Sequence, residues 1–209
     1  MPTTKTLTLY TFDELPTEAA REAARQWYRE GCGPEDFDSV IEDAEHILGM
    51  LGVTLKYHDV PLMNGKTRRA ANIWWQLGYC QSDGACFEGT YTYAKGAHRT
   101  IRAHAPKDTE LHRIADALLG LQRTHGYKLY AVVRQANQGM YPEVETDADG
   151  VRVTTETVRA LADLMRDLCT WIYQQLRTED EYRSANEQVD EMLCANEYTF
   201  RDDGSREDA

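Results

Sequence analysis

The fold is decided by the stretch Gln81-Ser82-Asp83-Gly84-Ala85-Cys86-Phe87-Glu88-Gly89, which combines turn-forming residues with reactive side chains. Two aromatic segments typical of strands, 72–77 and 87–93, lie on either side of its turn. A third strand is expected at 53–57, where apolar and polar residues alternate. Because the loops between these three segments are too short for crossover helices, we expect them to form an antiparallel meander.

Helices are expected before and after this sheet. Apolar residues recur at helical spacing over four segments, 17–30, 34–51, 109–125 and 155–176. A short basic helix is expected at 97–105, and further strands at 127–134, 141–145, 151–153 and 198–200. Since the strands cluster instead of alternating with helices, the sequence predicts an α+β fold, an antiparallel sheet of about five strands with helices packed against it.

The length of 209 residues suits one sizeable domain. We assign residues 1–200 to this domain and expect residues 201–209, which are polar and acidic, to form a disordered tail. No apolar run is long enough to span a bilayer, and no apolar signal core follows the N-terminal residues. The sequence therefore predicts a cytoplasmic protein that does not engage a membrane.

The formal net charge of the chain is −12, with acidic ends around a mildly basic middle. A surface this acidic repels phosphate, so direct nucleic-acid binding is not expected. The five cysteines are odd in number and contain no C-x-x-C pair, which argues against a disulfide framework and against a zinc ribbon. We expect reduced thiols, no metal and no cofactor.

Three reactive side chains of the central stretch are candidates for chemistry: Asp83, Cys86 and Glu88. On a strand that leaves a turn, Cys86 and Glu88 would share one face. A thiol nucleophile needs a nearby base, and the six histidines have no fixed spacing from Cys86. The alternative is structural, with glycines shaping a turn or bulge while Cys86 packs inward. The sequence favours the structural alternative and leaves an enzyme open.

Four further residues are candidates for binding. Trp74 and Tyr91 lie on expected strands, where they belong either to a tyrosine-rich interaction surface or to core and cross-strand pairs. An edge formed by residues 91–93 would support a homodimer. Arg99 and Arg102 lie on the basic helix, either in a phosphate-binding pocket or on a solvated face, and the solvated face is favoured.

The expected helix at 34–51 has a strongly acidic face opposite its apolar stripe. This face carries four candidate residues for contact with a partner: Glu35, Asp38, Glu42 and Glu45. A face of this kind is suited to occupy the basic nucleic-acid channel of another protein. The plainer alternative is a solvated helix surface, which is the common role of such charges.

Five motifs together resemble a family of small proteins encoded by tailed phages and prophages. They are the opening Phe12-Asp13-Glu14-Leu15, the core Asp83-Gly84-Ala85-Cys86-Phe87-Glu88-Gly89, the run Tyr93-Ala94-Lys95-Gly96, the segment 105–116, and the ending 189–191 with 196–200. Members are often labelled as antitoxins of a toxin–antitoxin stability system. The chain departs from the pattern at Ser82 and Pro16, where the family usually has glycine and serine. The resemblance implies an accessory protein in the cytoplasm of an infected bacterium and brings no catalytic residues.

We therefore hypothesise a noncatalytic bacteriophage accessory protein that inhibits a host defence factor, such as a CRISPR effector, by binding it. The expected partner is a host protein that belongs to a defence or nucleic-acid-handling complex. One alternative is an antitoxin-like regulator that neutralises a toxin. The other is a small enzyme or nucleotide-binding protein that uses the loop at residues 83–88.

Overall fold

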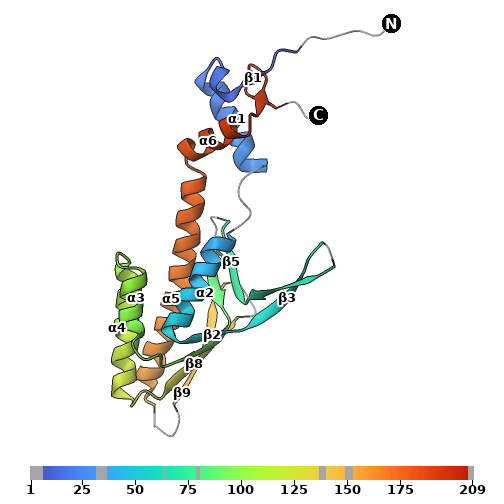
Figure 1. Cartoon of the computed structure of the whole chain (residues 1–209). Coiled ribbons are helices and arrows are strands. Elements are labelled where there is room, and N and C mark those ends of the chain that lie inside the picture. The colour runs from blue at the N-terminus through green and yellow to red at the C-terminus, as the bar shows by residue number, and fades with distance from the viewer. Residues whose placement is uncertain are drawn as a thin grey trace. The chain divides into compact units, whose positions relative to one another are not determined.

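The computed structural model in Figure 1 describes residues 7–31, 37–63, 65–78, 81–136, 140–148 and 153–206. These residues form two compact units: unit 1 comes from Met1–Phe37 and Thr178–Ala209, and unit 2 from Asp38–Arg177. The predicted α+β fold is confirmed, because the described helices accompany sheets in which every strand pair is antiparallel. That residues 1–200 behave as one domain stays a prediction.

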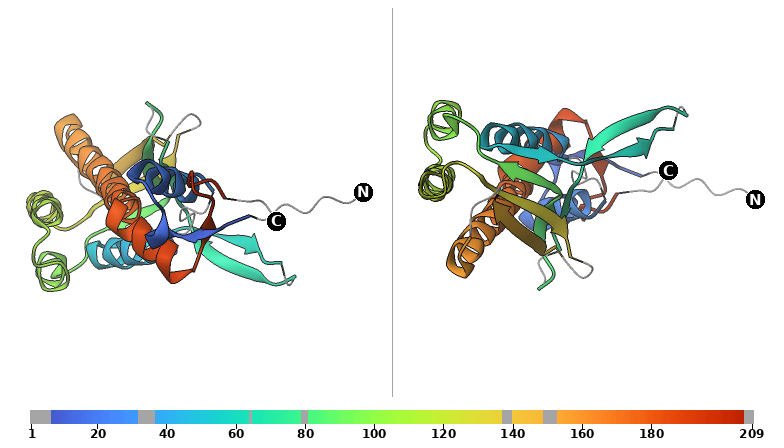
Figure 2. Two further views of the ribbon diagram at one scale, coloured as in Figure 1. Left: turned by 90° about the horizontal axis from the view of Figure 1, so that it is seen from above. Right: turned by 90° about the horizontal axis from the view of Figure 1, so that it is seen from below.

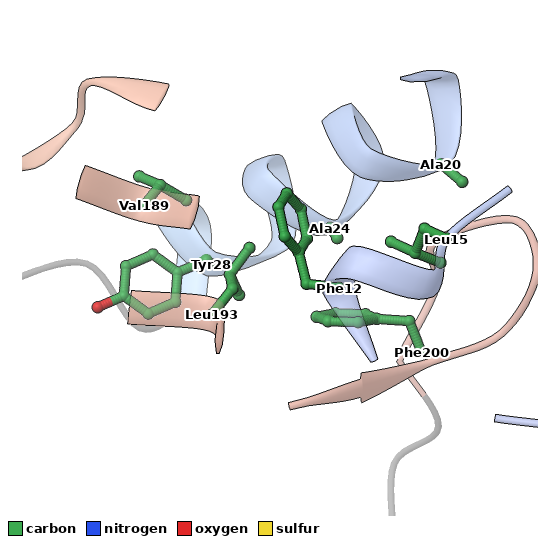
Figure 3. Close-up of a cluster of buried hydrophobic side chains, with 8 residues drawn as sticks. All are labelled: Phe12, Leu15, Ala20, Ala24, Tyr28, Val189, Leu193 and Phe200. Atoms are coloured by element: carbon green, nitrogen blue, oxygen red, sulfur yellow. The ribbon is translucent and has the colours of Figure 1, made fainter. Parts of the chain in front are cut away.

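Unit 1 combines the two ends of the chain. Its elements are β1 (Tyr10–Thr11), the short 3-10 helix η1 (Phe12–Glu14), α1 (Glu18–Gly31), α6 (Asn186–Ala195) and β10 (Thr199–Phe200). β1 pairs with β10, so the strand expected at 198–200 is confirmed. Figure 3 shows the buried core that joins these elements: Phe12, Leu15, Ala20, Ala24, Tyr28, Val189, Leu193 and Phe200.

A buried arginine adds a polar link between α1 and α6. Arg25 is 7% exposed, and its guanidinium donates to both carboxylate oxygens of Asp190, at 2.6 and 2.9 Å. The same guanidinium contacts Glu18 at 2.7 Å and Glu22 at 3.1 Å. These hydrogen bonds raise the pKa of Arg25, and the bond with Asp190 has the largest effect. The arginine therefore stays charged and ties residues that lie far apart in the sequence.

Part of the predicted disordered tail is a turn in the structure. Gly204 is buried with φ +83°, and a Cβ at this position would lie 2.0 Å from the carbonyl oxygen of Ala20. The guanidinium of Arg206 lies over the rings of Trp27 and Tyr198, at 4.6 and 4.8 Å. The tail prediction is therefore wrong for residues 201–206, because a glycine turn and cation–π contacts hold them. Residues 207–209 lie outside the described part of the chain.

Unit 2 holds most of the β-structure. Its helices are α2 (Asp38–Leu51), α3 (Ala97–His104), α4 (Thr109–Thr124) and the larger part of α5 (Thr155–Arg183). Its strands are β2 (Val53–Leu55), β3 (Tyr57–Pro61), β4 (Thr67–Ala71), β5 (Ile73–Gln76), β6 (Gly84–Phe87), β7 (Gly89–Thr92), β8 (Leu129–Gln135) and β9 (Pro142–Ala148). The strand expected at 151–153 lies mostly outside the described residues.

The strands of unit 2 divide into three sheets. The largest has the order β2-β7-β8-β9, and two hairpins, β3–β4 and β5–β6, stand apart from it. Figures 1 and 2 show the β3–β4 hairpin extending away from the four-stranded sheet. The expected meander does not form, because β2 pairs with β7 in the four-stranded sheet while β5 pairs with β6 in a separate hairpin. The predicted sheet of about five strands corresponds to four strands plus these hairpins.

Three single residues lie at the points of this division. Lys56, Asn72 and Glu88 each interrupt an extended segment, between β2 and β3, β4 and β5, and β6 and β7 respectively. Their main chains form a closed ring: Lys56 N–H donates to Glu88 O, Glu88 N–H to Asn72 O, and Asn72 N–H to Lys56 O, each at 2.8 Å. At this three-way junction every ribbon changes its partner, and the hydrogen bonds of the interrupted backbone are still satisfied.

The helices of unit 2 are anchored by buried polar contacts. The side chain of Gln122 on α4 is fully buried and bonds to the main chain of Leu129, donating to its oxygen at 2.8 Å. Asp108 caps α4 by accepting from Leu111 N at 2.8 Å, and it also accepts from Trp171 Nε1 on α5 at 2.7 Å. None of the described helices has both the length and the apolar character for crossing a membrane.

Candidate functional site

Two hollows meet on the exposed side of α2. The α2–β2 groove, of about 750 Å³, is lined by Glu42, Glu45, His46, Gly49, Met50, Val53, Thr54, Leu55 and Tyr57. The hairpin groove, of about 350 Å³, lies toward β3, β4 and β5, and its lining includes Asp38, Ile41, Glu42, Glu45, His58, Arg68, Arg69 and Trp74. Glu42 and Glu45 line both hollows, so the acidic face of α2 forms the border between them.

The three described carboxylates of this face have different environments. Asp38 accepts from Arg68 Nη1 at 2.6 Å, and this hydrogen bond lowers the pKa of Asp38. Glu45 accepts a hydrogen bond from the hydroxyl of Tyr57, which raises the pKa of that phenol. Glu42 is exposed and forms no hydrogen bond or ion pair with residues that the structure describes. Glu35, the fourth predicted residue of the face, lies outside the described residues.

The two grooves differ in the charge of their linings. In the hairpin groove, Arg68 and Arg69 stand opposite the carboxylates, and Arg69 lies over the Tyr57 ring at 4.4 Å. The described lining of the α2–β2 groove contains Glu42 and Glu45 but no lysine or arginine. The hairpin groove is thus nearly balanced in charge, whereas the α2–β2 groove is acidic and suits a cationic ligand.

A chain of side-chain hydrogen bonds connects the hairpin groove to the three-way junction. Asn72 Nδ2 donates to Glu88 Oε2 at 2.6 Å, which directs Asn72 Oδ1 toward His58 Nδ1 at 2.8 Å. Because a carboxylate only accepts, Asn72 Oδ1 must accept from His58, so neutral His58 carries its proton on Nδ1. Nε2 is then an acceptor. The His58 ring stacks on Trp74 with centroids 4.9 Å apart.

The central stretch proves to be structural. Asp83, which immediately precedes β6, accepts from Gly78 N at 2.9 Å. Cys86 is fully buried, and Gly89 lies where a Cβ would approach Thr54 O to 2.6 Å. Cys86 is buried within β6, whereas Glu88 lies one residue beyond the end of β6 at Phe87 and is half-buried at the junction.

Two of the predicted binding residues, Cys86 and Tyr91, are core residues. Cys86 cannot act as an accessible nucleophile, since its exposed fraction is 0% and its neighbour Cys169 on α5 is also buried. Tyr91 is 2% exposed, and its hydroxyl accepts from Gln122 Nε2 at 3.3 Å. Strand β7 pairs with β2 on one side and β8 on the other. The expected dimer edge at residues 91–93 is therefore wrong for Tyr91 and Thr92, whose strand has no open side.

The two arginines of the basic helix do not form a pocket with the other candidates. Arg102 on α3 contacts the Asp116 carboxylate of α4 through both terminal nitrogens, at 2.9 and 2.5 Å. Arg99 is exposed on the same helix. Of the predicted binding residues, the structure brings together Trp74, Glu88, Asp38, Glu42 and Glu45, and it places Cys86, Tyr91, Arg99 and Arg102 elsewhere in unit 2.

Sequence reasoning missed four residues of this region. No sequence pattern identifies His58 and Asn72 as site residues, because their partners are distant in the sequence. Both flank strand segments with alternating polarity. Tyr57 was assigned only to a strand. Gly49, which lines the α2–β2 groove, is a helix-interior glycine that local propensity does not favour, and this was the one available signal. Among the described residues, no group of three or more potential metal ligands comes together.

Comparison with known protein families identifies a match. A family model described as Domain of unknown function (DUF8835) matches residues 37–186, which is more than half of the chain. The matched segment contains all described residues of both grooves and the three-way junction. The chain matches no curated protein and no solved structure.

Proposed function

We propose that this chain, which belongs to the family described as Domain of unknown function (DUF8835), inhibits a host defence factor. It would do so by binding the factor, without catalysis. The protein would act as a bacteriophage accessory protein in the cytoplasm of the infected bacterium. A CRISPR effector is one factor of the expected kind. The phage setting rests on the sequence resemblance, and the binding mode rests on unit 2.

The observation that carries this proposal is the meeting of two grooves at Glu42 and Glu45. A concave surface next to exposed carboxylates and aromatic rings suits protein recognition better than an isolated charged face does. Defence factors that handle nucleic acid have basic channels for phosphate backbones. An acidic helix face beside a groove is complementary to such a surface, so binding there would exclude the nucleic acid.

The burial of Cys86 argues against the enzyme alternative that uses this thiol as a nucleophile. A catalytic thiol has to be reachable by substrate and is activated by an electropositive setting, whereas Cys86 is fully buried beside main-chain carbonyls. The antitoxin alternative uses the same kind of binding surface with a toxin as the partner. The experiment below therefore includes a toxin arm.

The test compares single charge reversals at two exposed positions of unit 2, one on α2 and one on β9. Wild type, Glu42→Lys and Glu143→Lys are expressed in strains that carry defined defence systems, and phage plating is measured. Glu143 is an exposed carboxylate on β9, at the opposite edge of the sheet from β2, so it matches the change in net charge. We expect wild type and Glu143→Lys to restore plating and Glu42→Lys to lose at least about tenfold of the effect.

The same variants are mixed with purified effector to measure inhibition of nucleic-acid cleavage directly. Circular dichroism confirms that each variant is folded. Failure of the wild-type protein to protect phage in any strain of the panel, or full activity of Glu42→Lys, contradicts the proposal. If the protein restores growth of cells that co-express a toxin from a neighbouring gene but does not protect phage, the antitoxin function is assigned instead.

A further inference from the structure

The β2 strand is an open edge of the four-stranded sheet. In the order β2-β7-β8-β9, β2 has a partner only in β7 among the described strands. The register pairs Val53 with Tyr91, Thr54 with Thr90 and Leu55 with Gly89. An unpaired strand edge exposes a row of donors and acceptors that a further extended chain can use.

Hydrogen bonds at both ends of β2 define which groups face outward. Thr92 N donates to Gly52 O at 2.9 Å, and Lys56 N donates to Glu88 O at 2.8 Å. Hydrogen-bonded and non-hydrogen-bonded pairs alternate along an antiparallel ladder. The main-chain groups of Thr54 therefore face β7, and those of Val53 and Leu55 point to the open edge. Val53 and Leu55 are 5% and 8% exposed, and both line the α2–β2 groove, so their outward main-chain groups lie on its side.

The wall of the groove beside this edge has two further features. Glu42 and Glu45 supply negative charge with no basic residue in the described lining. Gly49 lies inside α2, where glycine disfavours the helix, yet no atom would lie within 4 Å of a Cβ at this position. Nothing in the described chain therefore requires the absence of a side chain at Gly49. A close approach by the backbone of another molecule would require it.

The opposite edge of the sheet lacks this combination. β9 begins at Pro142, and its exposed positions carry Glu143, Glu145 and Asp147. Proline and charged side chains are the usual means of keeping an edge strand from pairing with another chain. The two edges of one sheet are thus protected differently, and only β2 combines an open edge with an acidic groove.

We propose that the α2–β2 groove binds an extended basic segment of the partner protein, which adds to the sheet as a strand beside β2. The main chain of the segment pairs with Val53 and Leu55, its arginine or lysine side chains meet Glu42 and Glu45, and its backbone passes close to Gly49. Strand addition supplies the main-chain contacts, and charge selects the sequence. This inference rests on the proposed function, because it specifies what the acidic face of α2 recognises.

The probe is a fluorescein-labelled peptide of alternating arginine and valine, measured by anisotropy against the full chain. One control peptide replaces arginine by glutamate. A second control keeps every arginine but carries N-methyl groups on alternate residues, so that its donors on one edge are blocked while its charge is unchanged. We expect saturable binding of the basic peptide only, with N-methylation weakening it at least about tenfold.

The sharpest variant is Gly49→Ala, because its effects on stability and binding have opposite signs. Alanine favours the helix, so the urea midpoint is expected to rise, while the added methyl group obstructs the groove and weakens the peptide at least about tenfold. Gly120→Ala is the matched control, since Gly120 is an exposed glycine of α4 that also has no atom within 4 Å of a Cβ. It should raise the midpoint without changing peptide binding.

Amide hydrogen exchange locates the peptide. We expect the Val53 and Leu55 amides to gain protection on peptide addition, whereas the Thr54 amide, which already faces β7, stays unchanged. No saturable binding, equal binding of the N-methylated peptide, or unchanged binding by Gly49→Ala would each overturn the inference. The proposed function has a separate readout, since phage protection that depends on Glu42 would survive the failure of every peptide experiment.

Discussion

Asn72 donates a 2.6 Å hydrogen bond from its side-chain amide to the Glu88 carboxylate, at the point where three β-ribbons exchange partners. This contact joins the signature stretch at residues 83–89 to the hairpin that borders the candidate site. It also fixes the orientation of the Asn72 amide, and through it the tautomer of His58. The junction is therefore both a structural joint and the support of one groove wall.

Removal of the Asn72 side chain should destabilise unit 2. Asn72→Ala leaves the partly buried Glu88 carboxylate without this donor, so we expect the free energy of unfolding to fall by about 1–3 kcal/mol. Gln26→Ala, which removes an exposed amide from α1, should change it by less than about 0.5 kcal/mol. Urea denaturation measures both. Equal effects of the two substitutions would show that the Asn72 bonds do not stabilise the junction.

Gly89 is required by the close approach of β2. A Cβ at Gly89 would lie 2.6 Å from Thr54 O and 3.1 Å from the Leu55 Cα, both main-chain atoms that cannot move without disturbing the pairing. We expect Gly89→Ala to lower the free energy of unfolding by about 1–3 kcal/mol. Gly120→Ala should raise it by about 0.5–1 kcal/mol. A neutral Gly89→Ala variant would contradict the registered pairing of Leu55 with Gly89.

The buried phenol of Tyr91 should make stability fall in alkaline solution. Burial, only partly offset by the Gln122 hydrogen bond, raises the pKa of Tyr91 to about 12. The unfolded phenol has a pKa near 10, so the folded state favours the neutral form. This contribution is complete below about pH 10 and is lost as the pH rises through the folded value. Its size is about 2–3 kcal/mol at 1.36 kcal/mol per pKa unit.

Urea denaturation at about pH 9 and about pH 11 measures this effect, since the two values lie on either side of the unfolded pKa. Tyr91→Phe keeps the ring and removes the ionisable group, so it should flatten the decline. Tyr141→Phe alters a phenol that is 62% exposed and should leave the decline as it is in wild type. An unchanged decline in Tyr91→Phe would assign the alkaline transition to other groups.

Local patterns in the sequence were enough to predict the fold class, most helices and the acidic face of α2. The periodicity of α5, the cap at Asp108 and the turn before β6 depend on neighbours within a few residues. The pairing of β2 with β7 depends on residues far apart in the chain, such as Val53 and Tyr91. No local propensity encodes such a contact, so the sequence alone predicts one meander.

The candidate site shows the same limit. Asp38, Glu42 and Glu45 follow from helical spacing, whereas the network of His58, Asn72 and Glu88 exists only after the junction forms. The sequence places Cys86 and Glu88 on one face because a continuous strand has a period of two. The ring of main-chain hydrogen bonds at Glu88 breaks that period. β6 ends at Phe87, so Cys86 and Glu88 do not belong to one continuous strand.

The described cysteines should differ sharply in reactivity toward iodoacetamide. Cys86 and Cys169 are buried, and the hydrogen bond with Cys86, together with burial, raises the pKa of Cys169. Cys194 is exposed, but partial burial and the nearby Asp13 carboxylate, 3.6 Å from its sulfur, raise its pKa too. Because the thiolate is the reactive form, we expect slow modification of Cys194 at neutral pH and faster modification in alkaline solution.

Peptide mass spectrometry assigns the modification to each cysteine and therefore separates these three from Cys32 and Cys80, which lie outside the described residues. In native protein Cys86 and Cys169 should stay unmodified while Cys194 reacts, and all three should react in urea. Asp13→Asn removes the negative charge beside Cys194 and should speed its modification without exposing Cys86. Rapid native modification of Cys86 would contradict its burial and restore the thiol as a candidate for chemistry, because access is the condition that the fold denies it.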